Sequence, residues 1–397
     1  MQLVEQHVIR KGDARYEAID QAAFASKNLY NAANYEIRQA FIFQGVYLNY
    51  HEMHRRMKSH EAYKVLPAKV AQQVLRILDK NWRSFFKAIA EFREHPEKFL
   101  GRPCLPKYKD KQKGRNLLVY TIQALSKPAL KQGYIVPSQL AIRIETQHQH
   151  VDQLRIVPRH GFYVVEVVYE QEAVQADVDP SLYAGIDIGI NNLATLTSNK
   201  KGFIPRIVNG RPLKSVNQFY NKRKAELQSK PGHEGTTNRM ERLTNKRTRR
   251  INHYLHTASR RIINLLVQES IGTLVIGKNP EWKQEVNMGK RNNQQFVCIP
   301  HARFIDMLTY KAELVGIQVI ITEESYTSKC SFLDNEPMKK QETYAGKRVK
   351  RGLFRASDGR LLNADVNGSA NIIRKVAPNA FADGVEAVVV RPVRFCA

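Results

Sequence analysis

The sequence predicts a protein in two parts: helices and antiparallel strands in the N-terminal part, and an α/β domain with a mixed sheet in the C-terminal part. The hydrophobic fraction of 43% and the charged fraction of 25% are ordinary for a folded chain of 397 residues. Residues 171–182 are polar and interrupted by a proline, as expected of a linker. Beyond it, strand-like and helix-like segments alternate, which is typical of a mixed sheet with helices packed on it.

The N-terminal part changes its hydrophobic period near residue 100. Residues 1–12 predict one short strand, and apolar residues recur at helical spacing between 15 and 97. The segment 100–116 contains two prolines and predicts a basic loop, in which we expect Arg102, Lys107 and Lys109 to face outward and contact phosphate. Residues 117–170 alternate in short runs separated by Gly and Pro, which predicts a small antiparallel sheet or barrel.

The charge balance predicts a polyanionic partner. The chain has 63 Lys and Arg against 37 Asp and Glu, a formal net charge of +26. Self-repulsion of this size favours binding to nucleic acid, whose phosphates release counterions when basic side chains neutralise them. No stretch approaches the ~18 apolar residues of a membrane span, and the first residues lack a signal-peptide core, so we expect a cytoplasmic, nucleoid-associated protein without membrane contact.

Two aspartates are candidates for a metal site. Asp187 lies in the run Gly-Ile-Asp-Ile-Gly, a predicted buried strand, where an anion is costly without a compensating cation or donors. Asp365 lies at the start of a predicted helix whose apolar side runs through Val366, Ala370 and Ile373. An aspartate at that place is more often an N-cap, but its pairing with Asp187 in so basic a chain favours the metal interpretation.

The motifs resemble those of a known family. GIDIGINN, YTSKCSFLD and ADVNGSANI, within residues 183–376, look like the RuvC motifs of the TnpB family, the transposon-encoded, RNA-guided DNA endonucleases similar to compact type V CRISPR effectors. The resemblance implies an RNase H-like (RuvC) domain at 179–397, with a basic helical insert at 213–270 and a degenerate zinc-ribbon loop at 328–362. It also implies an N-terminal wedge β-barrel formed by 1–14 and 99–178, with a helical recognition domain inserted at 15–98.

The resemblance further implies phosphodiester hydrolysis with two Mg²⁺ ions, or Mn²⁺ in their place, held by carboxylates ~3.5–4 Å apart. Asp187 and Asp365 match the first and third motif positions. The second motif of the family places a glutamate at the end of the next core strand, where this chain has Gly277-Lys278-Asn279. Either the chain is a guided binding protein that cannot cut, or a carboxylate from elsewhere completes the site.

The following strand supplies the candidates for that third carboxylate. It ends in Glu323-Glu324, and strand neighbours lie only ~4.8 Å apart, so one of the two could reach the same metal ions. Consecutive residues point to opposite faces, and we favour Glu324 because it immediately precedes the SYTSK turn. The remaining candidates are Glu323, Glu285 and Glu281.

The resemblance also implies a four-cysteine zinc ribbon, which this chain lacks. Only Cys330 remains, with Ser331, Asp334 and Ser357 among the residues where other ligands would fall. A tetrahedral zinc site needs four ligands, so we expect no zinc. The segment 334–360 then predicts a basic loop, with Lys347 and Arg348 available to nucleic acid.

The stretch between the second core strand and TLVIG predicts a helical hairpin with one apolar seam and one cationic face. We expect nucleic-acid contacts from Lys222, Arg223, Lys246, Arg247, Arg249 and Arg250. The resemblance implies that a guide RNA lies on this surface and that base pairing selects a double-stranded DNA target beside a short flanking motif.

Three functions therefore remain open at this point. The first is an RNA-guided, Mg²⁺-dependent DNA endonuclease of a transposon, active as a monomer. The second is a guided, nuclease-inactive DNA-binding protein of the repressor kind. The third is an unguided RNase H-like transposase, which the long N-terminal part disfavours.

Overall fold

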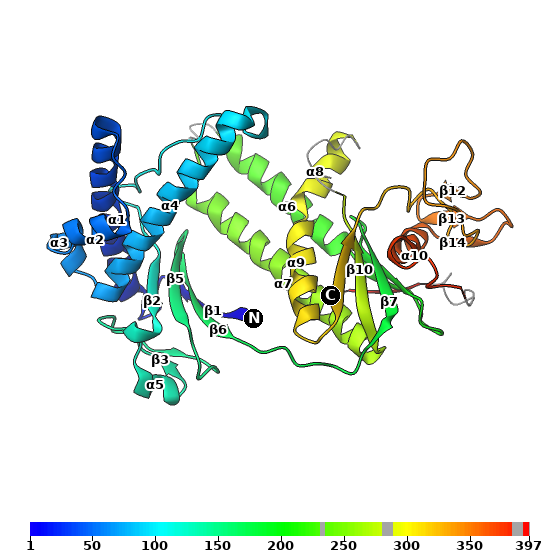
Figure 1. Ribbon diagram of the computed structural model, residues 1–397, viewed down its shortest axis with the longest axis horizontal. Coiled ribbons are helices and arrows are strands. Elements are labelled where there is room, and N and C mark those ends of the chain that lie inside the picture. Colours follow the sequence, from blue (N-terminus) through cyan, green and yellow to red (C-terminus); the bar gives the residue numbers. More distant parts are fainter. Residues whose placement is uncertain (231–234, 280–288, 383–391, 397) are drawn as a thin grey trace. The chain divides into compact units, whose positions relative to one another are not determined.

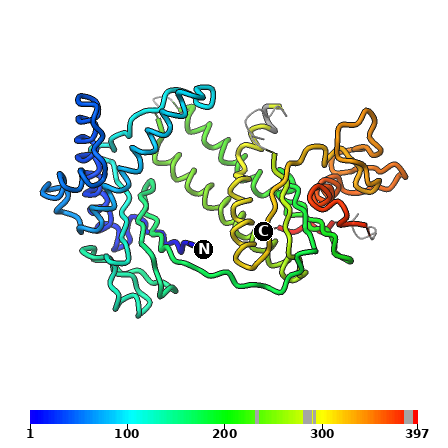
Figure 2. The backbone as a smooth tube through the Cα atoms, viewed as in Figure 1, coloured from blue at the N-terminus to red at the C-terminus, as the bar shows by residue number. Residues whose placement is uncertain are grey.

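The computed structural model describes residues 1–230, 235–279, 289–382 and 392–396. The chain divides into two compact units, Met1–Gln171 and Glu172–Ala397. Residues 171–178 form neither helix nor strand, and Figure 2 traces the chain through this segment from one unit into the next. Each unit has its own hydrophobic core and is described by itself.

The helices of the first unit follow the predicted helical pattern. They are α1 (Tyr16–Gln44), α2 (Tyr50–Met57), α3 (Glu61–Lys64), α4 (Ala68–Glu94) and the short η1 (Pro96–Lys98). Trp82 of α4 is fully buried and donates a hydrogen bond to Oδ1 of Asn34 on α1 (3.0 Å). The apolar stripes of α1 and α4 therefore face one another, as amphipathic helices require.

The strands of the first unit form a four-stranded antiparallel sheet in the order β1-β6-β5-β2. These strands are β1 (Gln2–Arg10), β2 (Leu118–Thr121), β5 (Gln153–Arg159) and β6 (Phe162–Glu170). The short β3 (Tyr134–Ile135) and β4 (Ile144–Glu145) pair separately, near η2 (Ile122–Ala124) and α5 (Lys127–Lys131). The predicted antiparallel sheet is confirmed. Because β1 and β2 are its edge strands and do not pair with each other, the predicted closure into a barrel is not confirmed.

The second unit contains the predicted mixed sheet, of six strands in the order β11-β10-β7-β8-β9-β15. They are β7 (Asp179–Ile188), β8 (Asn192–Ser198), β9 (Arg206–Asn209), β10 (Ile271–Gly277), β11 (Gln318–Thr322) and β15 (Val393–Phe395). β10 runs parallel to both β7 and β11, whereas β8 runs antiparallel to β7 and β9. The C-terminal ends of β7, β10 and β11 therefore lie along the same side of the sheet, together with the N-terminal end of β8.

Helices cover both faces of this sheet. The basic hairpin is α6 (Arg211–Gln228) and α7 (Asn238–Gln268), followed by α8 (Lys290–Cys298) and α9 (His301–Glu313). Leu255, Ile262 and Leu266 of α7 are fully buried in the core that also contains Ile186 of β7, which confirms the predicted apolar seam. Figure 1 shows α10 (Ala364–Val376) across the sheet from α7 and α9.

The prediction of a basic loop at 334–360 is wrong in part. The region contains β12 (Lys347–Lys350), β13 (Leu353–Arg355) and β14 (Leu361–Asn363), which form a three-stranded antiparallel sheet. Phe354 and Leu362 form a small core with Ala364, and apolar side chains on one face suffice to order a short sheet. Where a zinc ligand would fall, the Asp334 carboxylate instead accepts hydrogen bonds from the N–H (3.0 Å) and the hydroxyl of Ser357 (2.5 Å).

None of the helices in the described part of the chain combines the length and apolar character that crossing a bilayer requires.

Candidate active site

Asp187 lies on β7, at the sheet edge where β7, β10 and β11 end. Its side chain points toward α10, since a Cβ added to Gly368 would lie 2.9 Å from Oδ2 of Asp187. Desolvation raises the pKa of Asp187 well above its usual range, and the nearby carboxylates of Asp365 and Glu324 raise it further. The fold thus brings three acidic side chains into one electrostatic neighbourhood, although they come from distant parts of the sequence.

Asp365 occupies the first turn of α10 without capping it. Asn363 is the N-cap, and its Oδ1 accepts hydrogen bonds from the N–H groups of Asp365 (2.9 Å) and Val366 (3.2 Å). The Asp365 carboxylate is therefore directed elsewhere, to Nδ2 of Asn192 (2.6 Å) at the start of β8 and to Nη2 of Arg348 (3.8 Å). The helix N-terminus also favours an anion at this place.

Glu324 packs against Gly277, at the end of β10. A Cβ on Gly277 would lie 2.5 Å from Oε1 of Glu324, so a side chain at position 277 would require Glu324 to shift. The main chain is fixed as well, because the N–H of Glu324 donates to Oδ1 of Asn279 (2.8 Å). Burial raises the pKa of Glu324 to about 7, and its Oε1 is buried without a hydrogen-bond partner.

The other candidates for the third carboxylate differ from Glu324 in position. Glu323 is exposed and accepts a hydrogen bond from the hydroxyl of Ser325, as expected for the opposite face of the chain. Glu281 and Glu285 lie outside the described residues. Among the residues that the structure does describe, no three ligating side chains converge closely enough to enclose a metal ion.

A pocket of about 300 Å³ adjoins Asp365 and is lined by arginines. Arg348 and Arg351 come from β12 and the turn after it, Arg211 from the start of α6, and Arg394 from β15. Arg394 donates to Oδ1 of Asn192 (3.2 Å), the residue that in turn donates to Asp365. Four guanidinium groups around a single carboxylate make a site suited to phosphate, which arginine binds with paired hydrogen bonds.

Sequence reasoning missed part of this pocket. Arg351 belongs to the basic segment 334–360 that was expected to contact nucleic acid, and Asn192 belongs to the GINN motif, but the sequence does not single out Arg211 or Arg394. The position of Asn192 directly after the carboxylate strand is a signal that could have identified it. Nothing in the local sequence marks Arg211 or Arg394, because their proximity to Asp365 depends on the strand order.

The other predicted nucleic-acid contacts divide into exposed and engaged side chains. Exposed are Arg102, Lys107, Lys222, Arg223, Lys246, Arg249, Arg250, Lys347 and Arg348. Lys109 is partly buried, with Nζ 5.2 Å from the centre of the Tyr30 ring. Arg247 donates to Oδ1 of Asn217 (2.7 Å) and to the carbonyl of Cys298 (2.9 Å), so its side chain is held within the hairpin.

Two family models match this chain, almost entirely within the second unit. OrfB_IS605, described as a probable transposase, matches residues 166–283, and the Cas12f1-like TNB domain matches residues 301–372. The TnpB-like protein ORF457 of Acidianus two-tailed virus is 24% identical over 390 residues, which span 88% of this chain and 81% of that protein.

A solved structure shares the fold. The Cas12f1 chain from a complex of Cas12f1, sgRNA and target DNA aligns with a TM-score of 0.55 at 15% sequence identity, over 90% of this chain and 81% of that chain. This chain thus shares the fold of the Cas12f1 chain. The resemblance of this chain to the TnpB family is therefore confirmed.

Proposed function

We propose that this chain is an RNA-guided, Mg²⁺-dependent DNA endonuclease with a RuvC-like nuclease domain. The observation that supports the proposal is the packing of Glu324 against Gly277, where the charge of Glu324, like that of Asp365, raises the pKa of Asp187. A chain that had simply lost its second-motif glutamate would have no reason to hold a buried, unpartnered carboxylate at the same place.

The donor set fits divalent magnesium. Asp187, Glu324 and Asp365 offer only carboxylate oxygens, the hard ligands that Mg²⁺ and Mn²⁺ prefer. The repulsion that Asp365 and Glu324 exert on Asp187, and the unpartnered Oε1 of Glu324, are what a bound cation would relieve. When bound, the metal ions supply water activation and charge stabilisation for hydrolysis of a phosphodiester.

The surrounding side chains bind and orient the substrate in this proposal. Asn192 holds the Asp365 carboxylate at one oxygen, and Arg394 holds Asn192. The arginine-lined pocket takes a phosphate of the DNA strand, which neutralises guanidinium groups that otherwise face each other. Arg348 contacts the phosphate and Asp365 together, so it places the strand relative to the carboxylates.

The partners are proposed from the relatives. The Cas12f1 structure that shares this fold is a complex with sgRNA and target DNA, which supports a guide RNA and a double-stranded DNA target here. The net charge of +26 supports the same class of partner. We include in the proposal closure of the N-terminal sheet as a wedge barrel, the domain boundaries given above, a monomer, and action in the cytoplasm at the nucleoid.

A second candidate is a guided binding protein without cleavage. The observation that favours it is the sequence Gly277-Lys278-Asn279, where the family has its glutamate and where a lysine side chain would oppose a metal ion.

One assay separates the two. The protein is purified with its associated RNA and incubated with a matching duplex and Mg²⁺, as the parent chain, Glu324→Gln and Glu323→Gln. The proposal requires cleavage by the parent chain and by Glu323→Gln, and loss of cleavage in Glu324→Gln with target binding retained. Binding without cleavage by the parent chain selects the second candidate, and cleavage without RNA contradicts both.

A further inference from the structure

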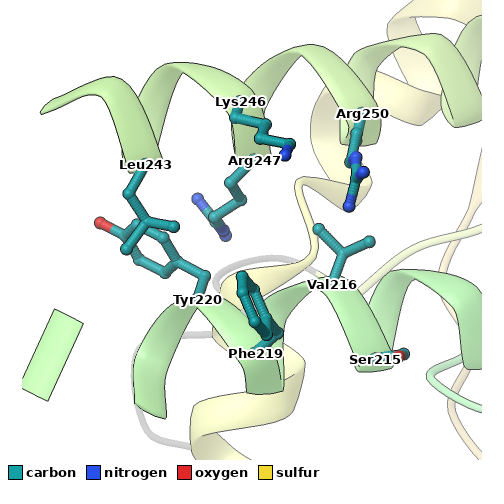
Figure 3. A pocket seen from close by; sticks show the side chains of 8 residues that line it. All are labelled: Ser215, Val216, Phe219, Tyr220, Leu243, Lys246, Arg247 and Arg250. Atoms are coloured by element: carbon teal, nitrogen blue, oxygen red, sulfur yellow. The ribbon is translucent and has the colours of Figure 1, made fainter. Parts of the chain in front are cut away.

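The two helices of the basic hairpin enclose a pocket that the carboxylate site does not use. It has a volume of about 240 Å³ and lies between α6 and α7 (Figure 3). Its lining from α6 is Ser215, Val216, Phe219 and Tyr220, and its lining from α7 is Leu243, Lys246, Arg247 and Arg250. Three cations and two aromatic rings thus line a small cavity whose wall contains no acidic residue.

The aromatic part of the pocket is exposed at Phe219. This side chain has 60% of its surface accessible to solvent, and its ring stands up from α6 toward α7 in Figure 3. Tyr220, beside it, is fixed by a hydrogen bond with Thr244 (3.1 Å) and by the guanidinium of Arg247, 4.9 Å from the ring centre. The pocket therefore offers one exposed aromatic face next to a fixed one.

Of the three cations that line the pocket, Arg247 is held by hydrogen bonds, whereas Lys246 and Arg250 are exposed. Arg247 is held by Asn217 and by the carbonyl of Cys298, so it keeps its place over Tyr220. Lys246 and Arg250 are exposed and flank Arg247 on the same helix (Figure 3). A planar ring entering here would meet the Phe219 ring, and its attached phosphate would lie within the field of Lys246 and Arg250.

We infer that this pocket binds one unstacked nucleobase of a single-stranded nucleic acid. The volume is below the ~300–1,000 Å³ of sites for drug-sized ligands, which suits a single ring system. Aromatic rings beside arginines are the stacking platform by which proteins hold bases of single strands, whatever the base. A duplex keeps its bases stacked and paired, so the occupant comes from an unpaired strand of RNA or DNA.

The inference rests on the proposed function for the presence of such a strand, but its test does not need cleavage. Binding of the full chain to single-stranded oligonucleotides is measured with an intact base and with an abasic residue at one central position, in RNA and in DNA. The parent chain is expected to prefer the intact strand. Phe219→Ala is expected to weaken binding of the intact strand roughly 5- to 150-fold, the usual range for one stacked base, and to leave the abasic strand unchanged.

Two matched variants separate stacking from charge and from general exposure. Arg249→Gln removes an exposed charge that is next to Arg250 but outside the pocket, and should weaken intact and abasic strands equally. Phe43→Ala removes an even more exposed phenylalanine from α1, and should change binding of neither strand. Phe219→Trp should retain the preference, with its tryptophan fluorescence quenched by the intact strand alone.

Equal weakening of both strands by Phe219→Ala, or no fluorescence change in Phe219→Trp, overturns the inference. The preferred arm, RNA or DNA, identifies the source of the base. If the chain does not cleave DNA but prefers the intact strand, the proposed function is wrong and the inference of a base pocket stands. If it cleaves DNA but shows no preference, the proposed function stands and the inference is wrong.

Discussion

The acidic edge of the mixed sheet and the basic α6–α7 hairpin use charge in opposite ways. Asp187, Glu324 and Asp365 come from three distant segments and are crowded and partly desolvated. The hairpin cations come from two neighbouring helices, and most of them are exposed. A desolvated charge depends on each neighbour, whereas exposed charges share their effect among many. Single substitutions should therefore be decisive at the sheet edge and mild on the hairpin.

The largest expected effect is on catalysis at Asp187. In Asp187→Asn, which keeps the shape and loses the charge, the single-turnover rate of Mg²⁺-dependent cleavage should fall by about 10³-fold or more, because the proposed site loses one of its metal-binding carboxylates. Binding of guide RNA and target should remain within about twofold of the parent chain by filter binding. A rate within tenfold of the parent would remove Asp187 from the site.

Lys311, a buried cation that contacts α7, differs from the exposed cations of the hairpin and allows a test of how burial changes the effect of a charge. Lys311 of α9 is only 3% exposed and donates to Oγ of Ser259 (2.7 Å) and to the carbonyl of His256 (2.8 Å) on α7. Burial, and then the charge of Arg260, lower the pKa of Lys311 from 10.5 to about 8. The unfolded chain thus binds the proton more tightly, so the free energy of unfolding should rise as the pH increases from about 8 to 10.5.

The rise attributable to Lys311 should be about 3 kcal/mol across that window, from ~1.4 kcal/mol per pKa unit. It is measured as the difference in denaturant unfolding between the parent chain and Lys311→Met at each pH. Parallel curves for the two proteins would show that Lys311 titrates normally in the folded state.

Close packing at the sheet edge predicts a strong effect of one methyl group at Gly277. In Gly277→Ala the new Cβ would lie 2.5 Å from Oε1 of Glu324 and 2.6 Å from Cδ1 of Ile372. The free energy of unfolding should fall by about 1–3 kcal/mol, as overpacking usually costs, and cleavage should fall with it because Glu324 is displaced. Gly101→Ala, where the added Cβ meets open space, should change neither quantity.

The crowded carboxylates also predict that activity and stability oppose one another. Without metal, Asp187→Asn should raise the free energy of unfolding by about 0.5–2 kcal/mol, since it replaces a carboxyl group whose ionisation is penalised by burial and by Asp365 and Glu324. Mg²⁺ should raise the thermal midpoint of the parent chain but not that of the variant, as followed by calorimetry. A metal-free variant less stable than the parent would show that the cluster is not strained.

The smallest effect is expected on the exposed face of the hairpin. Arg223 is exposed and forms an ion pair with Glu226 one turn away. Arg223→Gln should change the free energy of unfolding by less than about 0.5 kcal/mol and lower the salt dependence of RNA binding by about one counterion. A loss of binding that does not depend on salt would indicate a specific contact at Arg223 instead.

The sequence by itself determined the division of the chain, the mixed sheet and the candidate aspartates. The change of hydrophobic period and the polar linker predicted the division into two parts. The alternation of strands and helices predicted the mixed sheet. Asp187 stands out locally, because an anion in an apolar run is unexpected, whereas Asp365 became a candidate only through its pairing with Asp187. The high net charge predicted the class of partner without any structure.

The tertiary structure alone decided that Glu324, rather than Glu323, lies near Asp187, and what surrounds it. Glu323 and Glu324 are equivalent as letters, and only the parallel pairing of β10 with β11 sets one of them over Gly277. The arginine-lined pocket joins residues as far apart as Arg211 and Arg394. Period and composition describe which face of an element is buried; contacts between elements depend on strand order and close packing, which no local pattern contains.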